Sequence, residues 1–165
     1  MGRKGDSRRR SPRNGYLQAL GCGAPQTGIA ELSPRFLLDT HIVVRWLTAP
    51  GKLSREQARV LRDAVRRREP VAVSAITLIE IAILFGKGSA RGNTPIGELL
   101  GELETNPAFQ IVPLTVDVAA EAAALGGRLR DPADRAIVAT ARVCRLRLVT
   151  SDQRIIDSEL APVIA

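Results

Sequence analysis

Five acidic residues lie at positions from which their carboxylates could act together on a cation: Asp39, Glu80, Asp131, Asp134 and Asp152. Asp39 directly follows the short apolar run 36–38, and Asp152 comes shortly after the run 146–149. Both runs are typical of buried strands. The carboxyl ends of parallel strands meet at one edge of a sheet, which is where ligands bind in such sheets. We therefore expect Asp39 and Asp152 to lie at the same edge.

Glu80 and Asp134 are expected on helices. The stretch 75–85 around Glu80 is apolar on nearly every side, which predicts a buried helix. An isolated buried carboxylate is strongly unfavourable unless it is paired or coordinated. Asp134 lies three residues before Ile137 and four before Val138, so it shares the inward side of its helix with them. Both carboxylates are therefore expected where the sheet would gather them with Asp39.

Clustered carboxylates favour one kind of chemistry. Like charges at close range raise one another's pKa unless a cation neutralises them. An acidic pocket of oxygen ligands suits hard cations such as Mg²⁺ or Mn²⁺. A divalent ion held in this way can activate water and stabilise the transition state of phosphodiester hydrolysis. The pattern therefore indicates metal-dependent cleavage of phosphodiesters.

Each acid also has a structural explanation when it is taken alone. Asp39 could cap the following helix or occupy a turn, and Asp152 could be a turn residue. Asp131 precedes a proline and is a good helix N-cap, and Asp134 lies in the first turn, where the helix dipole favours an acid. Glu80 could occupy a solvated edge of its helix or form a buried ion pair. Only the combination of the acids argues for a shared site.

The elements expected to position these acids alternate between short strands and helices. Apolar runs predict strands at 36–38, 71–73, 109–114 and 146–149, with a further strand possible at 162–164. Capping residues and apolar periodicity predict helices that Thr40, Ser54, Ser74, Thr94-Pro95, Thr115 and Asp131-Pro132 open, with Ser54 and Gln57 forming a capping box. Their expected ends are near residues 48, 68, 85, 106, 129 and 143. This alternation indicates a buried parallel sheet in an α/β fold.

Composition separates a basic tail from the domain. Residues 1–34 carry six Lys or Arg against two acids, whereas residues 35–165 carry 18 against 15. The tail has no periodicity, so we expect 1–34 to be a disordered basic extension and 35–165 to form the domain. No apolar run reaches the roughly 18 residues of a membrane-spanning helix, and the tail is not a convincing signal peptide. A soluble, cytoplasmic protein with no membrane association is therefore expected.

Four blocks of the sequence are similar, in order and spacing, to the successive blocks of the PIN-domain family: FLLDTH (36–41), SAITLIEIA (74–82), RDPADRAIVATA (130–141) and LVTSD (148–152). The similarity spans 35–165 and is strongest to the branch that holds the toxins of VapBC-type toxin–antitoxin modules. It implies a three-layer α/β/α fold with a short central parallel sheet. It also implies that Asp39, Glu80, Asp134 and Asp152 are the catalytic, metal-binding acids, and that Asp131 is an additional metal ligand.

The resemblance implies a function as well. It predicts an endoribonuclease that uses Mg²⁺ or Mn²⁺ to activate water and leaves a 3′-hydroxyl and a 5′-phosphate. Such a protein would be the toxin of a type II toxin–antitoxin module. It would form a homodimer and be inhibited by a cognate antitoxin whose C-terminal segment occupies the groove. Thr150 or Ser151 would support the acids by hydrogen bonding. Apart from the resemblance, the position of Arg135 beside Asp134 would let it either reach a substrate phosphate or remain a solvated surface residue.

Two other functions are compatible with parts of the sequence. A phosphohydrolase of the haloacid dehalogenase type also has an aspartate after its first strand, but it requires a second aspartate at the position of His41. A catalytically silent module that binds RNA or protein would not need the intact acid set. Ala133 and Ile79 replace aromatic residues common in the PIN-domain pattern, and neither change removes a carboxylate.

Overall fold

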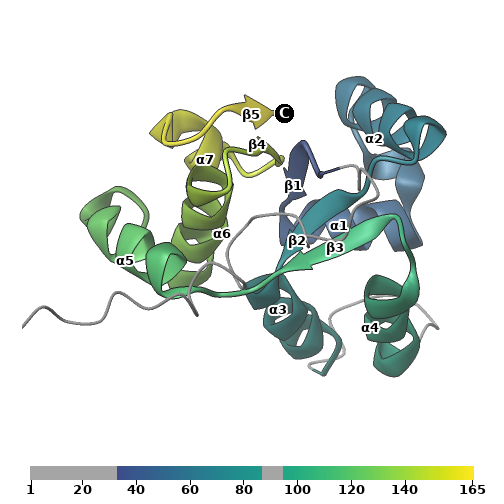
Figure 1. The fold of residues 1–165 in the computed structure, drawn as a ribbon, viewed down its shortest axis with the longest axis horizontal. Helices are drawn as coiled ribbons and strands as arrows, with labels where there is room; N and C mark the ends of the chain where they lie inside the picture. Colours follow the sequence, from purple (N-terminus) through teal and green to yellow (C-terminus); the bar gives the residue numbers. More distant parts are fainter. Residues whose placement is uncertain (1–32, 87–94) are drawn as a thin grey trace, which may run out of the picture.

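The computed structural model describes residues 33–86 and 95–165. Five strands form one parallel sheet in the order β3-β2-β1-β4-β5 (Figure 1). Leu37 of β1 pairs with Ala72 of β2 and with Leu148 of β4, so β1 is central. The strands are β1 Phe36–Leu38, β2 Val71–Ser74, β3 Phe109–Val112, β4 Arg147–Val149 and β5 Val163–Ile164. The expected short parallel sheet is confirmed.

Helices cover both faces of this sheet, which gives the expected three-layer α/β/α arrangement (Figure 1). One layer holds α1 Thr40–Thr48, α2 Arg55–Arg67, α3 Ala75–Gly86 and α4 Ile96–Thr105. The other layer holds α5 Val116–Ala124, α6 Pro132–Val143 and α7 Gln153–Ser158. Two short 3-10 helices, η2 Pro50–Lys52 and η3 Gly126–Arg128, complete the connections.

The two core layers follow from the alternation of side chains along the strands. Phe36 and Leu38 of β1 point to the layer of α1, α2, α3 and α4, where they pack with side chains such as Leu61. Leu37 between them points to the opposite layer, where it packs with Ile137 of α6. A sheet buried on both faces requires such continuous apolar runs. The runs in the sequence therefore identify the strands.

Several predicted helix starts are confirmed by their capping hydrogen bonds. Ser54 and Gln57 form the reciprocal capping box of α2. The Thr115 hydroxyl accepts a hydrogen bond from the backbone of Val118 and caps α5. Asp131 accepts one from the backbone of Ala133 and caps α6. These caps satisfy backbone N–H groups that have no partner within the helix.

One predicted cap is wrong. Thr40 is the first residue inside α1 and does not precede it, and its hydroxyl contacts Thr77 and Glu80 of α3. Ser74 directly precedes α3, as predicted, and its hydroxyl lies 3.2 Å from the Thr140 hydroxyl of α6. Both hydroxyls therefore make buried contacts with other elements.

The prediction that helix 75–85 is buried is also wrong in part. Only Thr77 and Ile81 of α3 are buried, whereas Ile79 and Ile83 are 56% and 50% exposed. The helix contacts α1, α4, α6 and β2, and the sequence does not distinguish its buried side because both sides are apolar. Two bounds differ by more than one residue, since β3 ends at Val112 and α5 ends at Ala124 before the 3-10 turn η3.

Some expectations concern residues outside the described ranges. The basic extension 1–34 lies there except for Ser33 and Pro34, and so do the glycine-containing stretch after residue 86 and the capping residue Thr94. Within 33–86 and 95–165, no helix is long and apolar enough to cross a membrane.

Candidate active site

Asp39 is the most buried of the candidate acids. It follows β1, its backbone N–H donates to the carbonyl of Val149 at the end of β4 (3.0 Å), and its side chain is almost inaccessible. Its carboxylate does not cap α1, although Asp39 occupies the capping position. Instead, Oδ2 accepts a 2.6 Å hydrogen bond from the Thr150 hydroxyl. The interpretation of Asp39 as a helix cap is therefore excluded.

The environment of Asp39 acts on its pKa in two directions. Burial raises the pKa, because a low dielectric disfavours the ionised form. The hydrogen bond from Thr150 lowers it in part, and the charge of Asp152 raises it further. The net shift is upward. Such a carboxyl gains from a nearby cation, since a cation offsets the cost of ionisation without water.

Glu80 reaches the same edge of the sheet from α3. Its Oε2 accepts a 2.6 Å hydrogen bond from the hydroxyl of Thr40, the residue after Asp39. Burial raises the pKa of Glu80, the Thr40 hydrogen bond opposes the shift, and the charges of Asp39 and Asp131 add to it. Glu80 therefore lies on the same side of the sheet edge as Asp39, held to it through one threonine.

Asp134 and Asp152 are joined by a single guanidinium. Arg154 of α7 donates from Nη2 to Asp152 Oδ2 (2.6 Å) and lies 3.4 Å from Asp134 Oδ2. The Asp134 side chain is only 14% exposed. Burial and then the charge of Asp131 raise the pKa of Asp134 to about 6, while Arg154 holds the pKa of Asp152 below its ordinary value. The guanidinium of Arg154 thus bridges two of the candidate acids.

Asp131 lies at the rim of this group. It is exposed, and its Oδ1 accepts a 2.8 Å hydrogen bond from the backbone of Ala133, so its structural role as a cap is real. Its charge also raises the pKa of Asp134 and of Glu80. One residue therefore both starts α6 and adds negative potential to the site.

A network of neutral side chains holds the turn between Asp39 and Asp152. Thr150 donates to Asp39 and accepts from the backbone N–H of Asp152 (3.0 Å). Gln57 of α2 is completely buried, and its Nε2 donates to the Thr150 carbonyl (3.1 Å) and to the Ser151 hydroxyl (2.9 Å). The expected support from Thr150 is confirmed. Gln57 connects the capping box of α2 to the acid-bearing turn.

Three residues of the site were not predicted from the sequence: Thr40, Gln57 and Arg154. Thr40 and Gln57 carry capping signals, which explain them locally and conceal their contacts with distant elements. Arg154 lies two residues after Asp152, and this spacing allows the bidentate contact that is observed. That spacing is the one signal that could have identified Arg154.

The acids are coupled by charge, but separate donors hold them. Asp39 is held by Thr150, Glu80 by Thr40, and Asp134 and Asp152 share Arg154. Within the part of the chain that the structure describes, no three His, Cys, Asp or Glu side chains are arranged to hold a metal ion. The donor chemistry nevertheless suits a hard cation, since the three partly buried acids with raised pKa values all gain from positive charge.

Comparison with known proteins shows the family to which the chain belongs. The family model for the PIN domain matches residues 36–158. Ribonuclease VapC22 of Mycobacterium tuberculosis is 35% identical over 120 residues, which cover 72% of this chain and 88% of that protein.

Solved structures share the fold. The structure of FitAcB from Neisseria gonorrhoeae superposes with a TM-score of 0.58 at 26% identity, covering 79% of this chain and 96% of the other. The structure of VapBC2 from Rickettsia felis, bound to a DNA fragment from its promoter, has a TM-score of 0.58 at 16% identity and covers 78% and 96% of the two chains. The second likeness, at that identity, shows the fold alone.

Proposed function

This chain belongs to the PIN-domain family, in its VapC-type branch, and from that premise we propose that it is a metal-dependent endoribonuclease, the toxin of a type II toxin–antitoxin module. The observation that carries the proposal is the buried Asp39 and the half-buried Glu80 at the carboxyl edge of the sheet, coupled by charge to Asp131, Asp134 and Asp152. RNA as the substrate would place its action in the cytoplasm.

Asp39, Glu80, Asp134 and Asp152 would hold Mg²⁺ or Mn²⁺, with Asp131 contributing from the rim. When bound, such an ion stabilises negative charge on a phosphodiester and makes water a better nucleophile. The hydroxyls of Thr150 and Thr40 orient the carboxylates of Asp39 and Glu80.

Two arginines complete the proposed site. Arg154 would have to share or release the oxygens of Asp134 and Asp152 for these to serve as ligands. Its side chain is 68% exposed, so it would be accessible to substrate. Arg135 has a buried Nε without a hydrogen-bond partner among the described residues, and we assign it to the substrate phosphate.

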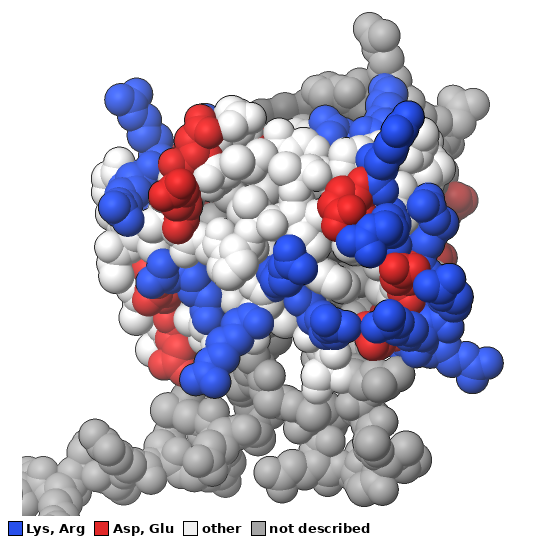
Figure 2. All heavy atoms as spheres, turned by 90° about the horizontal axis from the view of Figure 1, so that it is seen from above, with Lys and Arg blue, Asp and Glu red and all other residues white. Residues whose placement is uncertain are grey.

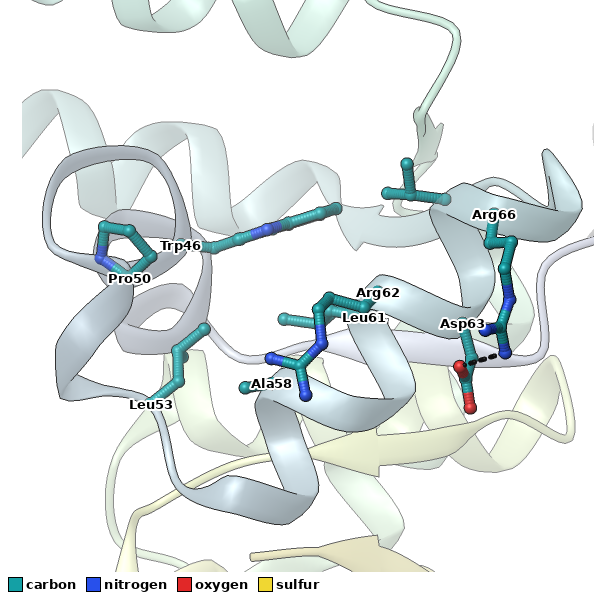
Figure 3. A pocket seen from close by; sticks show the side chains of 9 residues that line it. Trp46, Pro50, Leu53, Ala58, Leu61, Arg62, Asp63 and Arg66 are labelled. Atoms are coloured by element: carbon teal, nitrogen blue, oxygen red, sulfur yellow. Dashed lines mark hydrogen bonds and ion pairs between the residues drawn. The ribbon is translucent and has the colours of Figure 1, made fainter.

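The antitoxin would bind the cavity between α1 and α2 (Figure 3). This cavity measures about 650 Å³ and is lined by apolar side chains that include Trp46, Leu53 and Val65. Arg62, Asp63 and Arg66 also line it, and Arg66 forms an ion pair with Asp63 (Figure 3). An apolar floor with a net positive rim fits a segment with apolar anchors and acidic flanks, and a short antitoxin segment can supply both. The related FitAcB structure supports a partner of this class.

A second copy of the chain is the other proposed partner. Ile79 and Ile83 lie one helical turn apart on α3 and are at least half exposed. Exposed apolar pairs of this kind are suited to an interface between copies. Light scattering of the purified protein would give a mass twice that of the monomer, and Ile79→Glu would lower it.

The direct test is cleavage of RNA by the purified full-length chain. We expect cleavage in Mg²⁺ or Mn²⁺, none in EDTA, and products with a 5′-phosphate and a 3′-hydroxyl. RNA binding without cleavage in every divalent ion would instead identify a silent binding module. Hydrolysis of a small phosphate monoester with no action on RNA would identify a phosphohydrolase and contradict the proposal.

A further inference from the structure

The exposed face of α2 carries a stripe of arginines. Arg55, Arg59, Arg62 and Arg66 are spaced by four, three and four residues, so they lie along one side of the helix. All four are exposed. Arg59 and Arg66 form ion pairs with acids of the same helix, whereas Arg55 and Arg62 have no ion pair within 4.0 Å among the described residues. Figure 2 shows Lys and Arg side chains gathered on the side of the molecule where α2 lies, with acidic side chains between them.

The helix α2 runs from the carboxyl ends of the strands to their amino ends. At its start, Ser54 contacts the carbonyl of Ala165 and Gln57 contacts Thr150, beside the proposed catalytic acids. At its end, Arg67 lies beside Arg35, which precedes β1 at the opposite edge. Thirteen helical residues span about 20 Å. The stripe therefore leads from the acidic site to the amino edge of the strands.

A basic pocket lies at that amino edge. Arg35, Arg59, Arg67 and Arg147 line a cavity of about 220 Å³, together with Asp63 and Glu69. Arg35 and Arg67 lie 4.0 Å from Glu69, the limit of an ion pair. Arg147, the first residue of β4, has no ion pair within 4.0 Å among the described residues and is exposed. Arg59 pairs with Glu56 and Asp63, so Arg147 is the guanidinium of this pocket that has no acidic partner within 4.0 Å among the described residues.

The charge of the domain is concentrated on this face. Residues 55–69 hold six arginines against three acids, and Arg35 and Arg147 bring the local net charge to +5. The whole of 35–165 has a net charge of only +3, from 18 Lys or Arg against 15 acids. The rest of the domain is therefore net negative, and a polyanion would be attracted to this face in particular.

We propose that this face binds the phosphodiester backbone of an RNA strand beyond the bond that is cut. The face, which we call the arginine track, consists of Arg55, Arg59, Arg62 and Arg66 with the pocket residues Arg35, Arg67 and Arg147. The inference rests on the proposed function for its RNA substrate. A guanidinium pairs with phosphate oxygens through two parallel hydrogen bonds, and these contacts do not read sequence. The track therefore holds the strand and favours long substrates over short ones.

The test compares variants of the track with a matched control. Arg147→Gln and the double variant R67Q/R147Q remove track charges, and Arg128→Gln removes an exposed arginine of η3 outside the track. Binding of an RNA of about fifteen nucleotides is measured in EDTA over a range of salt concentrations. We expect the slope of log K against log salt to fall by about 0.7 for each track arginine removed, and the Arg128→Gln slope to stay at the wild-type value.

Cleavage kinetics supply a second readout. With the long RNA in Mg²⁺, R67Q/R147Q should raise KM by about tenfold and leave kcat unchanged. The lost contacts bind the RNA equally in the ground state and in the transition state. With an RNA of about three nucleotides, which cannot extend from the acids to the pocket, the variant and wild type should not differ. Melting temperatures within about two degrees of wild type would show that the variants fold.

The outcomes separate this inference from the proposed function. If R67Q/R147Q binds and cleaves long RNA as wild type does, the track is not an RNA surface, while the nuclease proposal stands. If no variant or wild type cleaves RNA, the nuclease proposal fails, and salt-dependent binding in EDTA still tests the track. If the substitutions weaken binding of the antitoxin or of duplex DNA but not of RNA, the face serves that other partner and the inference is overturned.

Discussion

At the scale of single residues, two threonine hydroxyls orient the two deepest carboxylates of the site. Thr150 donates to Asp39 and Thr40 donates to Glu80, each at 2.6 Å. Hydrogen bonds to an ionised acceptor are stronger than those between neutral groups. Each also opposes the rise in pKa that burial causes. The threonines therefore keep the acids closer to the ionised state that the proposed metal binding would need.

Replacing Thr150 by valine tests this role. Thr150→Val leaves Asp39 without its side-chain donor, so we expect the pKa of Asp39 to rise and the pH–rate profile to move to higher pH. Stability should fall by roughly 1–3 kcal/mol, the cost of leaving a buried polar group unpaired. Thr150→Ser, which keeps the hydroxyl, is the control and should retain the wild-type profile. Identical profiles for the valine and serine variants would show that the hydroxyl does not act on Asp39.

Asp134 makes folding and activity depend on pH in opposite directions. Its pKa is about 6 in the folded chain, above the ordinary 3.8, so the folded state binds a proton more readily between these values. Stability of the metal-free protein should therefore fall as pH rises from about 4 to about 6. RNA cleavage should rise over the same range as the carboxyl ionises.

Thermal unfolding of wild type and Asp134→Asn in EDTA checks this dependence. The asparagine variant should lose part of the decline in melting temperature across that pH range. The control Glu104→Gln changes an exposed acid of α4 and should keep the wild-type slope. A slope in Asp134→Asn as steep as in wild type would contradict the assignment of the raised pKa to Asp134.

At the scale of secondary-structure elements, α2 connects three features of the molecule. Its buried Gln57 holds the turn after β4, one side contributes to the apolar cavity beside α1, and its exposed side carries the arginine stripe. The sequence predicts its start and length from the capping box and the apolar periodicity. It does not predict the contact with Thr150, because 93 residues separate that pair.

Gln57→Leu, compared with Ser54→Ala, separates the capping role of Gln57 from its contact with Thr150. It removes half of the capping box and the donor to Thr150, so stability should fall by roughly 2–3 kcal/mol in a denaturant titration. Cleavage per folded molecule should fall as well, since the turn before Asp152 loses its support. Ser54→Ala removes the other half of the box, with an expected loss of about 1 kcal/mol and near wild-type cleavage. Equal cleavage by the leucine variant and wild type would show that Gln57 serves only α2.

The elements also show where prediction from sequence ends. Strand runs and caps such as Thr115 were predictable, because a parallel sheet needs continuous apolar runs and helix ends need donors and acceptors. The exposed side of α3 was not, because Ile79 and Ile83 look the same as buried Ile81 in an apolar stretch. The positions of the acids along the strands were predictable, whereas the donors that hold each of them depend on contacts between distant segments.

At the scale of the whole molecule, the domain 35–165 should fold without the preceding residues. Deleting 1–34 should leave the melting temperature nearly unchanged, because a segment without a periodic apolar face buries little surface. Circular dichroism of the full-length and shortened chains checks this. A loss of several degrees would show that the N-terminal segment packs on the domain.

The charges of the molecule are divided between two faces. The acids gather at the carboxyl edge of the sheet, and the basic excess lies along α2 and at the amino edge. The proposed metal-dependent nuclease would need both kinds of surface, since its cation would have to meet a negatively charged strand that acids alone would repel. At the acidic edge itself, the guanidinium of Arg154 offsets part of the negative charge of Asp134 and Asp152.

The most direct test of this account is the rate of RNA cleavage by Asp39→Asn in Mg²⁺ or Mn²⁺. Asparagine keeps the shape of the side chain and can accept the Thr150 hydrogen bond, but it carries no charge. The account predicts loss of cleavage by at least about a thousandfold with an intact fold and no loss of stability in EDTA, since one buried, self-repelling charge is gone. Overexpression of the variant should not arrest growth. Cleavage at the wild-type rate by the folded variant would contradict the account, because Asp39 would then be only a structural residue.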